Sequence, residues 1–325
     1  MTRPTIYELT LRDGLMIRPR ISIKAKTELI DRLMKCGIYN FEVIRFPLDG
    51  KYSQFNEGIE ILESLQRFRK DGALLAAFAM GEAGVAQATE FTSLFDELHI
   101  PCFVSDQYSA YAFGDWSWNR SLQLAEKTLQ SCEGAGIEVT VGLGTSFGCP
   151  LRPGHEISWT VEKVRDLHKL GIQTIMLGDT AGTATPAMVR TTLAQVKCIT
   201  DFRVLRVHFH NTLGRALLNS WTAAECGIDG IDTSLLGLGG EPHPYFISSD
   251  RVDNGNCATE ELFPLLTTDG ENKDDEASVF ELYDIARWFA SQLSGDVPGR
   301  APFAQFIPLV IGDPGNEVSQ GTHRH

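Results

Sequence analysis

The stretch VLRVHFHNTLGRALLNSWTAAECGIDGIDTSLLGLGGEP, residues 204–242, contains the pattern that decides the fold. It starts with a short β-rich run that carries His208 and His210, continues as a helical pattern, and ends in a second short run followed by glycines. Side chains at positions i and i+2 of a strand point to the same side, so we expect both imidazoles on one face. A strand, a helix and a further strand in this order predict a parallel sheet.

Eight short apolar runs, each followed by a longer segment of helical pattern, extend this alternation over most of the chain. The runs cover residues 5–9, 40–45, 74–80, 94–104, 138–145, 174–178, 204–210 and 230–234. Eight is the number of strands that closes a (β/α)₈ barrel. A doubly wound open sheet is the alternative, but the glycine run here follows the last strand rather than the first. The sequence therefore predicts an α/β protein with a TIM barrel.

Local signals support the helices of this barrel and suggest where it ends. A helical pattern over residues 24–36 stops at Gly37, and Thr185 followed by Pro186 has the composition of a helix N-terminus. We expect the barrel to occupy residues 1–262. Residues 263–325 are expected to form a C-terminal helical extension packed on the barrel, with a flexible tail.

Composition and charge exclude several classes of partner. The chain of 325 residues has a formal net charge of −13 and no basic block, so we expect no nucleic-acid partner. The longest apolar stretch, residues 72–88, is interrupted by Glu82, so no membrane span is expected. Seven cysteines without framework spacing indicate free thiols, and the N-terminal residues lack the apolar core of a signal peptide. A cytoplasmic location is the expectation.

Polar residues lie where several predicted strands end, which is the end at which barrel enzymes carry their active sites. Asp13 follows the first strand, and His208 and His210 lie at the end of the seventh. An H-x-H pair alone more often holds one surface and one core histidine, but the aspartate is expected at the same mouth. One carboxylate and two imidazoles leave coordination positions open, which suits Mg²⁺, Mn²⁺ or Fe²⁺ better than a closed structural Zn²⁺ site.

Several motifs, in order along the chain, resemble those of a known superfamily. They are TLRDG at 10–14, TSFGCP at 145–150, GDTAGTATP at 178–186, the 204–242 stretch with its GLGGxP run, and GNxATEE at 255–261. Together they resemble the TIM-barrel metallolyases named for an Asp-Arg-Glu motif, and within these 3-hydroxy-3-methylglutaryl-CoA lyase. Isopropylmalate and homocitrate synthases are condensing relatives. The resemblance implies a (β/α)₈ barrel that binds a divalent cation, most often Mg²⁺ or Mn²⁺.

The resemblance also implies roles for individual residues. It makes Asp13, His208 and His210 metal ligands, with Asn256 as a fourth or neighbouring one. A separate set would perform the chemistry: Arg12 stabilises the enolate, Glu42 orients Arg12, and Asp179 assists proton transfer at the substrate hydroxyl. A fixed guanidinium beside the developing negative oxygen is what cleavage of a 3-hydroxy acyl compound requires.

The sequence departs from the lyase pattern at the proton donor. Glu241 stands where the glycine loop of the lyases carries a cysteine, and Glu241 is expected to take over its acid–base role. Cys257 and His243 are nearby alternatives. Met16 replaces a glutamine of the same pattern and is expected to contact the substrate.

Two further departures concern the substrate pocket. Residues 105–121 are rich in aromatic side chains, and Tyr111 and Trp116 are expected to form an apolar wall over the substrate. Packing against another subunit is the alternative. Arg45 replaces a small polar residue and is expected to hold a substrate carboxylate, with an ion pair to Glu42 or Asp49 as the alternative.

The leading hypothesis is a metal-dependent carbon–carbon lyase acting on a 3-hydroxy acid or its CoA thioester, with an altered substrate. The alternative is a condensing acyltransferase that joins an acyl-CoA to a 2-oxo acid. A non-catalytic barrel is a third class, which the retained site residues disfavour. The partners expected are a small-molecule substrate and a second copy of the chain in a homodimer.

Overall fold

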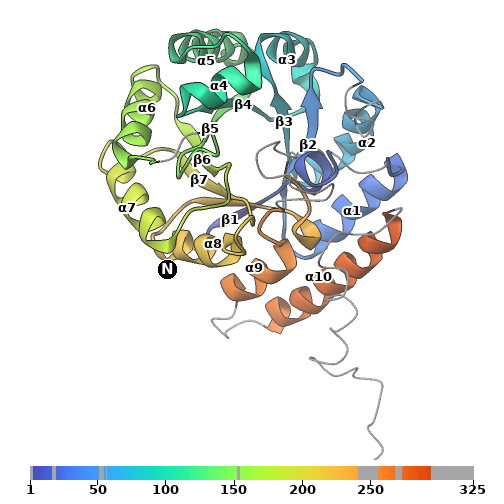
Figure 1. The fold of residues 1–325 in the computed structure, drawn as a ribbon. Helices are drawn as coiled ribbons and strands as arrows, with labels where there is room; N and C mark the ends of the chain where they lie inside the picture. Colours follow the sequence, from blue (N-terminus) through green and yellow to red (C-terminus); the bar gives the residue numbers. More distant parts are fainter. Residues whose placement is uncertain are drawn as a thin grey trace, which may run out of the picture.

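The chain folds into a closed barrel of eight parallel strands surrounded by helices, seen down its axis in Figure 1. In this computed structural model, residues 3–16, 20–50, 55, 57–151, 154–240, 255–267 and 273–293 are described, with side chains in the last range from residue 279 onward. Each strand pairs with the next one in sequence, and the first pairs with the eighth. The predicted TIM barrel is confirmed.

The strands agree with the eight predicted apolar runs. They are β1 (Thr5–Glu8), β2 (Asn40–Phe46), β3 (Leu74–Ala79), β4 (Glu97–Phe103), β5 (Glu138–Gly144), β6 (Thr174–Asp179), β7 (Val204–Phe209) and β8 (Gly230–Thr233). Most strand ends lie within one residue of the prediction. The exception is the start of β4, where residues 94–96 precede the strand, because the apolar run begins in the preceding turn.

The helices cover the outside of the barrel. They are α1 (Ile23–Lys35), α2 (Ile59–Lys70), α3 (Gly81–Ala88), α4 (Asp106–Phe113), α5 (Trp118–Glu133), α6 (Ile157–Lys169), α7 (Pro186–Lys197) and α8 (Ala216–Glu225). The predicted start of α7 is confirmed, since Thr185 Oγ1 accepts a hydrogen bond from the Met188 amide. The predicted stop of α1 is confirmed as well, because Gly37 follows the helix with a φ of +83°.

Two more helices follow the barrel. The helix α9 (Thr259–Thr267) contacts β1 and α8, and α10 (Lys273–Gln292) packs against α1 and α9, as Figure 1 shows at the lower edge of the barrel. The predicted division between residues 262 and 263 falls inside α9, and the tail from residue 294 lies outside the described residues. Among the described residues, no helix combines the length and the apolar composition needed to cross a membrane.

The barrel interior is polar along β7 because alternate residues point inward. Leu205, Val207 and Phe209 belong to the hydrophobic core that the barrel shares with its helices. Arg206 and His208 point the other way, into the barrel, where both are buried. This alternation brings the charged residues of β7 to the barrel axis and carries His208 toward the mouth.

Candidate active site and metal centre

Arg12 and Asp13 lie on a π-helical turn, η1 (Thr10–Gly14), directly after β1. The amides of Gly14 and Leu15 donate to the carbonyls of Leu9 and Thr10, which widens the turn relative to an α-helix. Arg12 Nη1 donates to Asp13 Oδ1 at 2.7 Å, so adjacent residues hold each other in place. Both side chains are buried at the mouth of the barrel.

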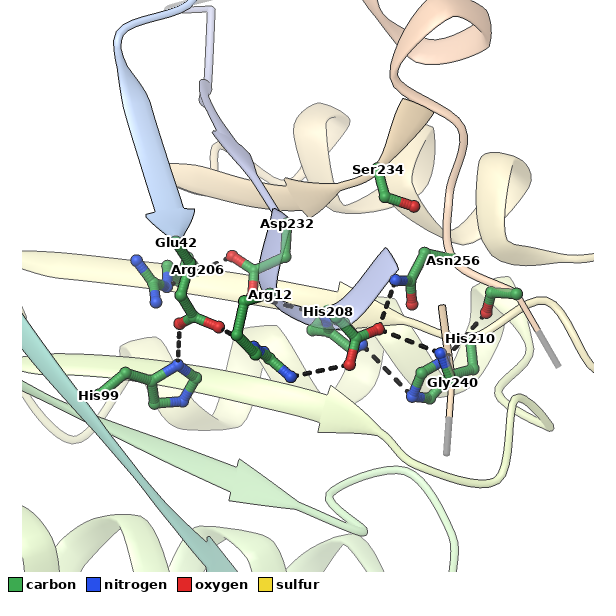
Figure 2. Close-up of polar contacts among 12 residues, drawn as sticks. Arg12, Glu42, His99, Arg206, His208, His210, Asp232, Ser234, Gly240 and Asn256 are labelled. Atoms are coloured by element: carbon green, nitrogen blue, oxygen red, sulfur yellow. Dashed lines mark hydrogen bonds and ion pairs between the residues drawn. The ribbon is translucent and has the colours of Figure 1, made fainter. Parts of the chain in front are cut away.

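Asp13, His208 and His210 come together although about 195 residues separate them in sequence. Each offers a ligand atom, and these atoms all lie within 4.8 Å of one another. The Nε2 atoms of the two histidines face each other at 3.4 Å, with Asn256 beside them, as Figure 2 shows. The sequence expectation that these three side chains share one face of the barrel mouth agrees with this geometry.

The outer nitrogens of both rings point away from this centre. His210 Nδ1 lies 2.9 Å from the Gly255 carbonyl, which can only accept, so Nδ1 carries the hydrogen. His208 Nδ1 faces Asp232 Oδ2 at 3.4 Å. Burial, and next the neighbouring His208, lower the pKa of His210 to about 4. At neutral pH its Nε2 therefore presents a lone pair toward Asp13 and His208.

Asn256 and the glycine run complete this side of the mouth. Asn256 Nδ2 donates to Asp13 Oδ2 at 2.6 Å and to the Leu238 carbonyl at 2.9 Å, and the Gly240 amide donates to the same aspartate oxygen at 3.1 Å. A Cβ on Gly239 would lie 2.2 Å from Asn256 Nδ2 and 2.4 Å from Asp13 Oδ2. Only glycine therefore allows the loop to approach so closely.

These residues fit a divalent cation. The set offers a carboxylate, two imidazole nitrogens and the amide oxygen of Asn256, which is buried and has no hydrogen-bond partner among the described residues. Burial raises the pKa of Asp13, but Arg12 and the two histidines outweigh it and leave that pKa below its ordinary value. Asp13 is therefore ionised. A mixed O/N set of this kind suits Mg²⁺ or Mn²⁺.

Glu42 connects Arg12 to His99, a residue that the sequence analysis did not single out. Arg12 Nε donates to Glu42 Oε1, and His99 Nδ1 lies 2.6 Å from Glu42 Oε2. Burial raises the pKa of Glu42, but Arg12 and His99 outweigh it and hold the pKa well below its usual range. Glu42 is therefore an anion that orients the guanidinium of Arg12, which also lies over the ring of Phe78.

A bulge in β2 brings Glu42 and Arg45 to the same side. Residues three apart on a regular strand face opposite sides, but the pairing of β2 with β3 shifts register between Glu42 and Ile44. As a result Glu42 contacts Arg12, and Arg45 also lines the cavity at the barrel mouth. The sequence pattern alone did not reveal this bulge.

The cavity has one charged side and one apolar side. Among the described residues, those that line it are Arg12, Asp13, Met16, Arg45, Phe78, Met80, His99, Pro101, Phe103, Tyr108, Gly142, Gly144, Met176, Gly178, Thr180, His208 and His210. This lining contains two guanidinium groups and a single carboxylate, which favours an anionic ligand. Met16 and Arg45, both expected at the substrate, lie in it.

The two aromatic residues expected to form the apolar wall do not line this cavity. Tyr111 is 47% exposed, and Trp116 is buried behind the wall, where its Nε1 donates to Ser121 Oγ at 2.8 Å. The wall is formed instead by Phe103 and Tyr108, whose ring centroids are 4.7 Å apart. The expected aromatic wall exists, but the expected residues do not face it, because the helical turn of α4 points Tyr108 inward and Tyr111 outward.

Asp179 also differs from its expected position. Gly178 and Thr180 line the cavity, and Asp179 between them does not. Its carboxylate accepts hydrogen bonds from the amides of Thr183 and Ala184 at 3.2 and 3.0 Å, which fixes the loop before α7. Burial raises its pKa to about 6. The expected catalytic Glu241, with the alternative His243, lies outside the described residues.

The fold and the site together define the class of this protein. It is a (β/α)₈ barrel in which a carboxylate and two imidazoles converge at the mouth beside a buried arginine. A family model described as HMGL-like matches residues 3–288. The chain belongs to this HMGL-like family, which confirms the resemblance of its sequence motifs.

Individual relatives cover most of the chain. The mitochondrial hydroxymethylglutaryl-CoA lyase of Bos taurus is 30% identical, over 80% of this chain and 77% of its own. Hydroxymethylglutaryl-CoA lyase YngG of Bacillus subtilis is 28% identical, over 91% of this chain and 95% of its own. The crystal structure of hydroxymethylglutaryl-CoA lyase from Pseudomonas aeruginosa has a TM-score of 0.80 at 25% identity, covering 94% of this chain and 99% of that one.

Proposed function

We propose that this protein is a divalent-metal-dependent carbon–carbon lyase that cleaves a 3-hydroxy acid or its CoA thioester. The observation that carries the proposal is the convergence of Asp13, His208 and His210 beside the buried guanidinium of Arg12. Relatives named hydroxymethylglutaryl-CoA lyase, similar over most of the chain, support this reaction class. The lining of the cavity supports an acidic substrate.

Asp13, His208, His210 and Asn256 would hold the cation. When bound, a divalent cation there would make the hydroxyl group of a chelated substrate more acidic. Arg12 lies next to this position, and its two partners, Glu42 and Asp13, prevent the guanidinium from rotating. Its positive charge then faces the oxygen that becomes negative when the carbon–carbon bond breaks, and this arrangement needs no reorganisation during the reaction.

The substrate is proposed to differ from that of the relatives. Arg45 adds a second guanidinium to the cavity and would bind a carboxylate of the substrate. Phe103 and Tyr108 would contact an apolar group of the same molecule. Glu241 is proposed to exchange a proton with the product carbon in place of the cysteine of the lyases. The homodimer and the cytoplasmic location stay predictions.

Product analysis by mass spectrometry tests the proposed reaction. Purified protein with Mg²⁺ or Mn²⁺ is incubated with a panel of 3-hydroxy acids and hydroxyacyl-CoAs, and in parallel with mixtures of an acyl-CoA and a 2-oxo acid. Cleavage to a ketone or keto acid, abolished by a chelator and restored by the metal, is the expected result. Thiol release only from the acyl-CoA mixtures would overturn the lyase proposal and indicate the condensing acyltransferase.

A further inference from the structure

His99 is one of the residues that line the cavity and lies outside the set of residues assigned above. It lies on β4 and is completely buried. Its ring packs edge-on against Phe78, with centroids 5.1 Å apart, and lines the cavity together with Arg12. Among the described lining residues, His99 is the one imidazole that is not directed at the metal position.

The hydrogen-bond partner of His99 Nδ1 determines which tautomer the imidazole ring adopts. His99 Nδ1 lies 2.6 Å from Glu42 Oε2, and Glu42 is ionised because Arg12 and His99 stabilise its charge. An ionised carboxylate can only accept, so Nδ1 carries the hydrogen. In the neutral ring Nε2 then has the lone pair. Figure 2 shows the Glu42 carboxylate between the side chains of Arg12 and His99.

Nε2 has no hydrogen-bond partner among the described residues, although it is buried. Leaving a buried nitrogen without a partner is destabilising, because the nitrogen gives up its hydrogen bond to water and gains none in return. The neighbouring strand makes room for it: a Cβ on Gly142 of β5 would lie 2.1 Å from Nε2. A glycine at this inward position keeps the nitrogen uncovered by any side chain of β5. Such an uncompensated group in a cavity wall is expected to have a partner in the substrate.

We propose that His99 is a catalytic acid–base residue whose Nε2 exchanges the substrate hydroxyl proton while Glu42 holds the ring. This inference rests on the proposed lyase reaction. The hydroxyl proton moves to Nε2, and the O–H electron pair forms the new C=O bond as the carbon–carbon bond breaks. The electrons of that bond form the enolate. A proton returned to the enolate carbon completes the products, so that no oxidant or reductant is needed.

The charges around His99 come from several elements. Glu42 on β2 faces Nδ1, and Arg12 on η1 shares that carboxylate. Arg206 on β7 also stabilises the Glu42 charge. Glu97, two residues before His99 on β4, forms an ion pair with Arg206 at 3.0 Å. The ring is therefore placed between a fixed anion on one side and the cavity on the other, as in other carboxylate-oriented imidazole bases.

Two substitutions separate catalysis from a purely positioning role. In His99→Asn, the amide nitrogen can replace Nδ1 and still donate to Glu42, but Nε2 is lost. We expect kcat to fall about 100-fold or more, with KM and Mn²⁺ affinity within threefold of wild type. If His99 only positions Glu42, His99→Asn retains kcat within a few-fold whereas His99→Ala loses it, and that result would overturn the proposal. His168→Gln, on α6 outside the cavity, is the control.

A measurement without substrate keeps the proposal testable if the lyase proposal fails. The wild-type protein is labelled with ¹⁵N-imidazole histidine, and the signals of its eight histidines are compared with the His99→Asn spectrum. We expect a protonated Nδ1 and, in the neutral ring, an Nε2 that carries no hydrogen. A bare Nδ1 with a permanently protonated Nε2 would overturn the role of His99. Absence of cleavage by an enzyme with the expected tautomer would overturn the lyase assignment instead.

Discussion

Two buried charged clusters lie one above the other in the barrel, and β7 contributes to both. In the lower cluster Arg206 forms ion pairs with Glu97 at 3.0 Å and Asp232 at 3.3 Å and lies over the Tyr7 ring. In the upper cluster the Nε2 atoms of His208 and His210 face each other at 3.4 Å beside Asp13. In the lower cluster each charged group is paired with an opposite charge of the protein. In the upper cluster, a carboxylate oxygen and two imidazole nitrogens face one another, and such a group of potential ligand atoms is the property of a ligand site.

Asp232 joins the two clusters, because one oxygen faces Arg206 Nε and the other faces His208 Nδ1. A carboxylate behind a metal-binding histidine fixes the ring orientation and raises its basicity. Arg206 in turn keeps this carboxylate in place. The comparison therefore indicates that the lower cluster stabilises the fold and supports the upper one, while the upper cluster is the one proposed to bind the substrate and the cation.

The largest effect is expected from Asp13→Asn. This substitution keeps the size of the side chain and removes the negative charge from the upper cluster. Activity should fall by at least about a thousandfold, and Mn²⁺ affinity should fall with it. Thermal unfolding should be little affected, because Arg12, the cation paired with Asp13, keeps its second partner Glu42. A large drop in Tm with normal metal affinity would show that the upper cluster is structural, contrary to the comparison.

The lower cluster should respond in the opposite way. Arg206→Met leaves two buried carboxylates without their cation, which typically costs about 3–5 kcal/mol of unfolding free energy. Arg203→Met is the matched control, since Arg203 pairs with Glu138 but is 60% exposed, and surface pairs contribute less than about 1 kcal/mol. Denaturant titration measures both. Equal losses for the two variants would contradict the role of Arg206 as the buried cation of two carboxylates.

Glu8 is a buried carboxylate whose hydrogen-bond partners are neutral groups, unlike the carboxylates of the two charged clusters. Thr10 and Thr259 hydroxyls donate to it, and burial raises its pKa to about 7. The native state then keeps a proton that the unfolded state loses above about pH 4.5, so unfolding free energy should fall as pH rises to about 7. Glu8→Gln should make this slope shallower by the contribution of Glu8, on the order of 3 kcal/mol, while the buried Glu260 and Asp179, whose pKa values are also raised, keep their own contributions. Exposed Glu63→Gln should leave the slope unchanged, and an identical slope in Glu8→Gln would refute the assignment.

A smaller effect is expected at the edge of the upper cluster. Arg45→Ala should raise KM about 10- to 100-fold and lower kcat less, because a bound carboxylate contributes equally to substrate and transition state. Steady-state kinetics with the substrate found by product analysis measures this split. Unchanged KM and kcat would remove Arg45 from the substrate site.

The smallest effect is expected from Tyr111→Ser. This residue is 47% exposed and does not line the cavity, so KM should stay within about twofold of wild type. Tyr108→Ala, one helical turn earlier in the same helix, should raise KM because Tyr108 does line the cavity. Equal KM values for the two variants would contradict the orientation of α4.

The sequence was sufficient for the barrel because each strand is a short apolar run with its own stop signals. It was also sufficient to bring Asp13, His208 and His210 together, since parallel strands all end at one mouth. Placing side chains by the strand that they end failed where the direction in which a side chain points decides whether it lines the cavity. Asp179 ends β6, yet Gly178 and Thr180 on either side are the residues that line the cavity.

The remaining differences depend on contacts between strands that no local pattern contains. Glu42 and Arg45 reach the same side through a register shift between β2 and β3. His99 lies within a strand rather than at its end, and its place in the cavity wall depends on Gly142 of the neighbouring strand, where a Cβ would lie 2.1 Å from Nε2. A glycine at an inward position of the strand next to the histidine was the one signal in the sequence that could have indicated it.

The most direct test of the central claim is pulsed electron paramagnetic resonance of Mn²⁺ bound to the metal-stripped protein. We predict one Mn²⁺ per chain with magnetic coupling to two imidazole nitrogens. His208→Ala or His210→Ala should remove one of these couplings, and His168→Gln should remove neither. Mn²⁺ binding without any nitrogen coupling, or no binding at all, would contradict the proposed metal centre.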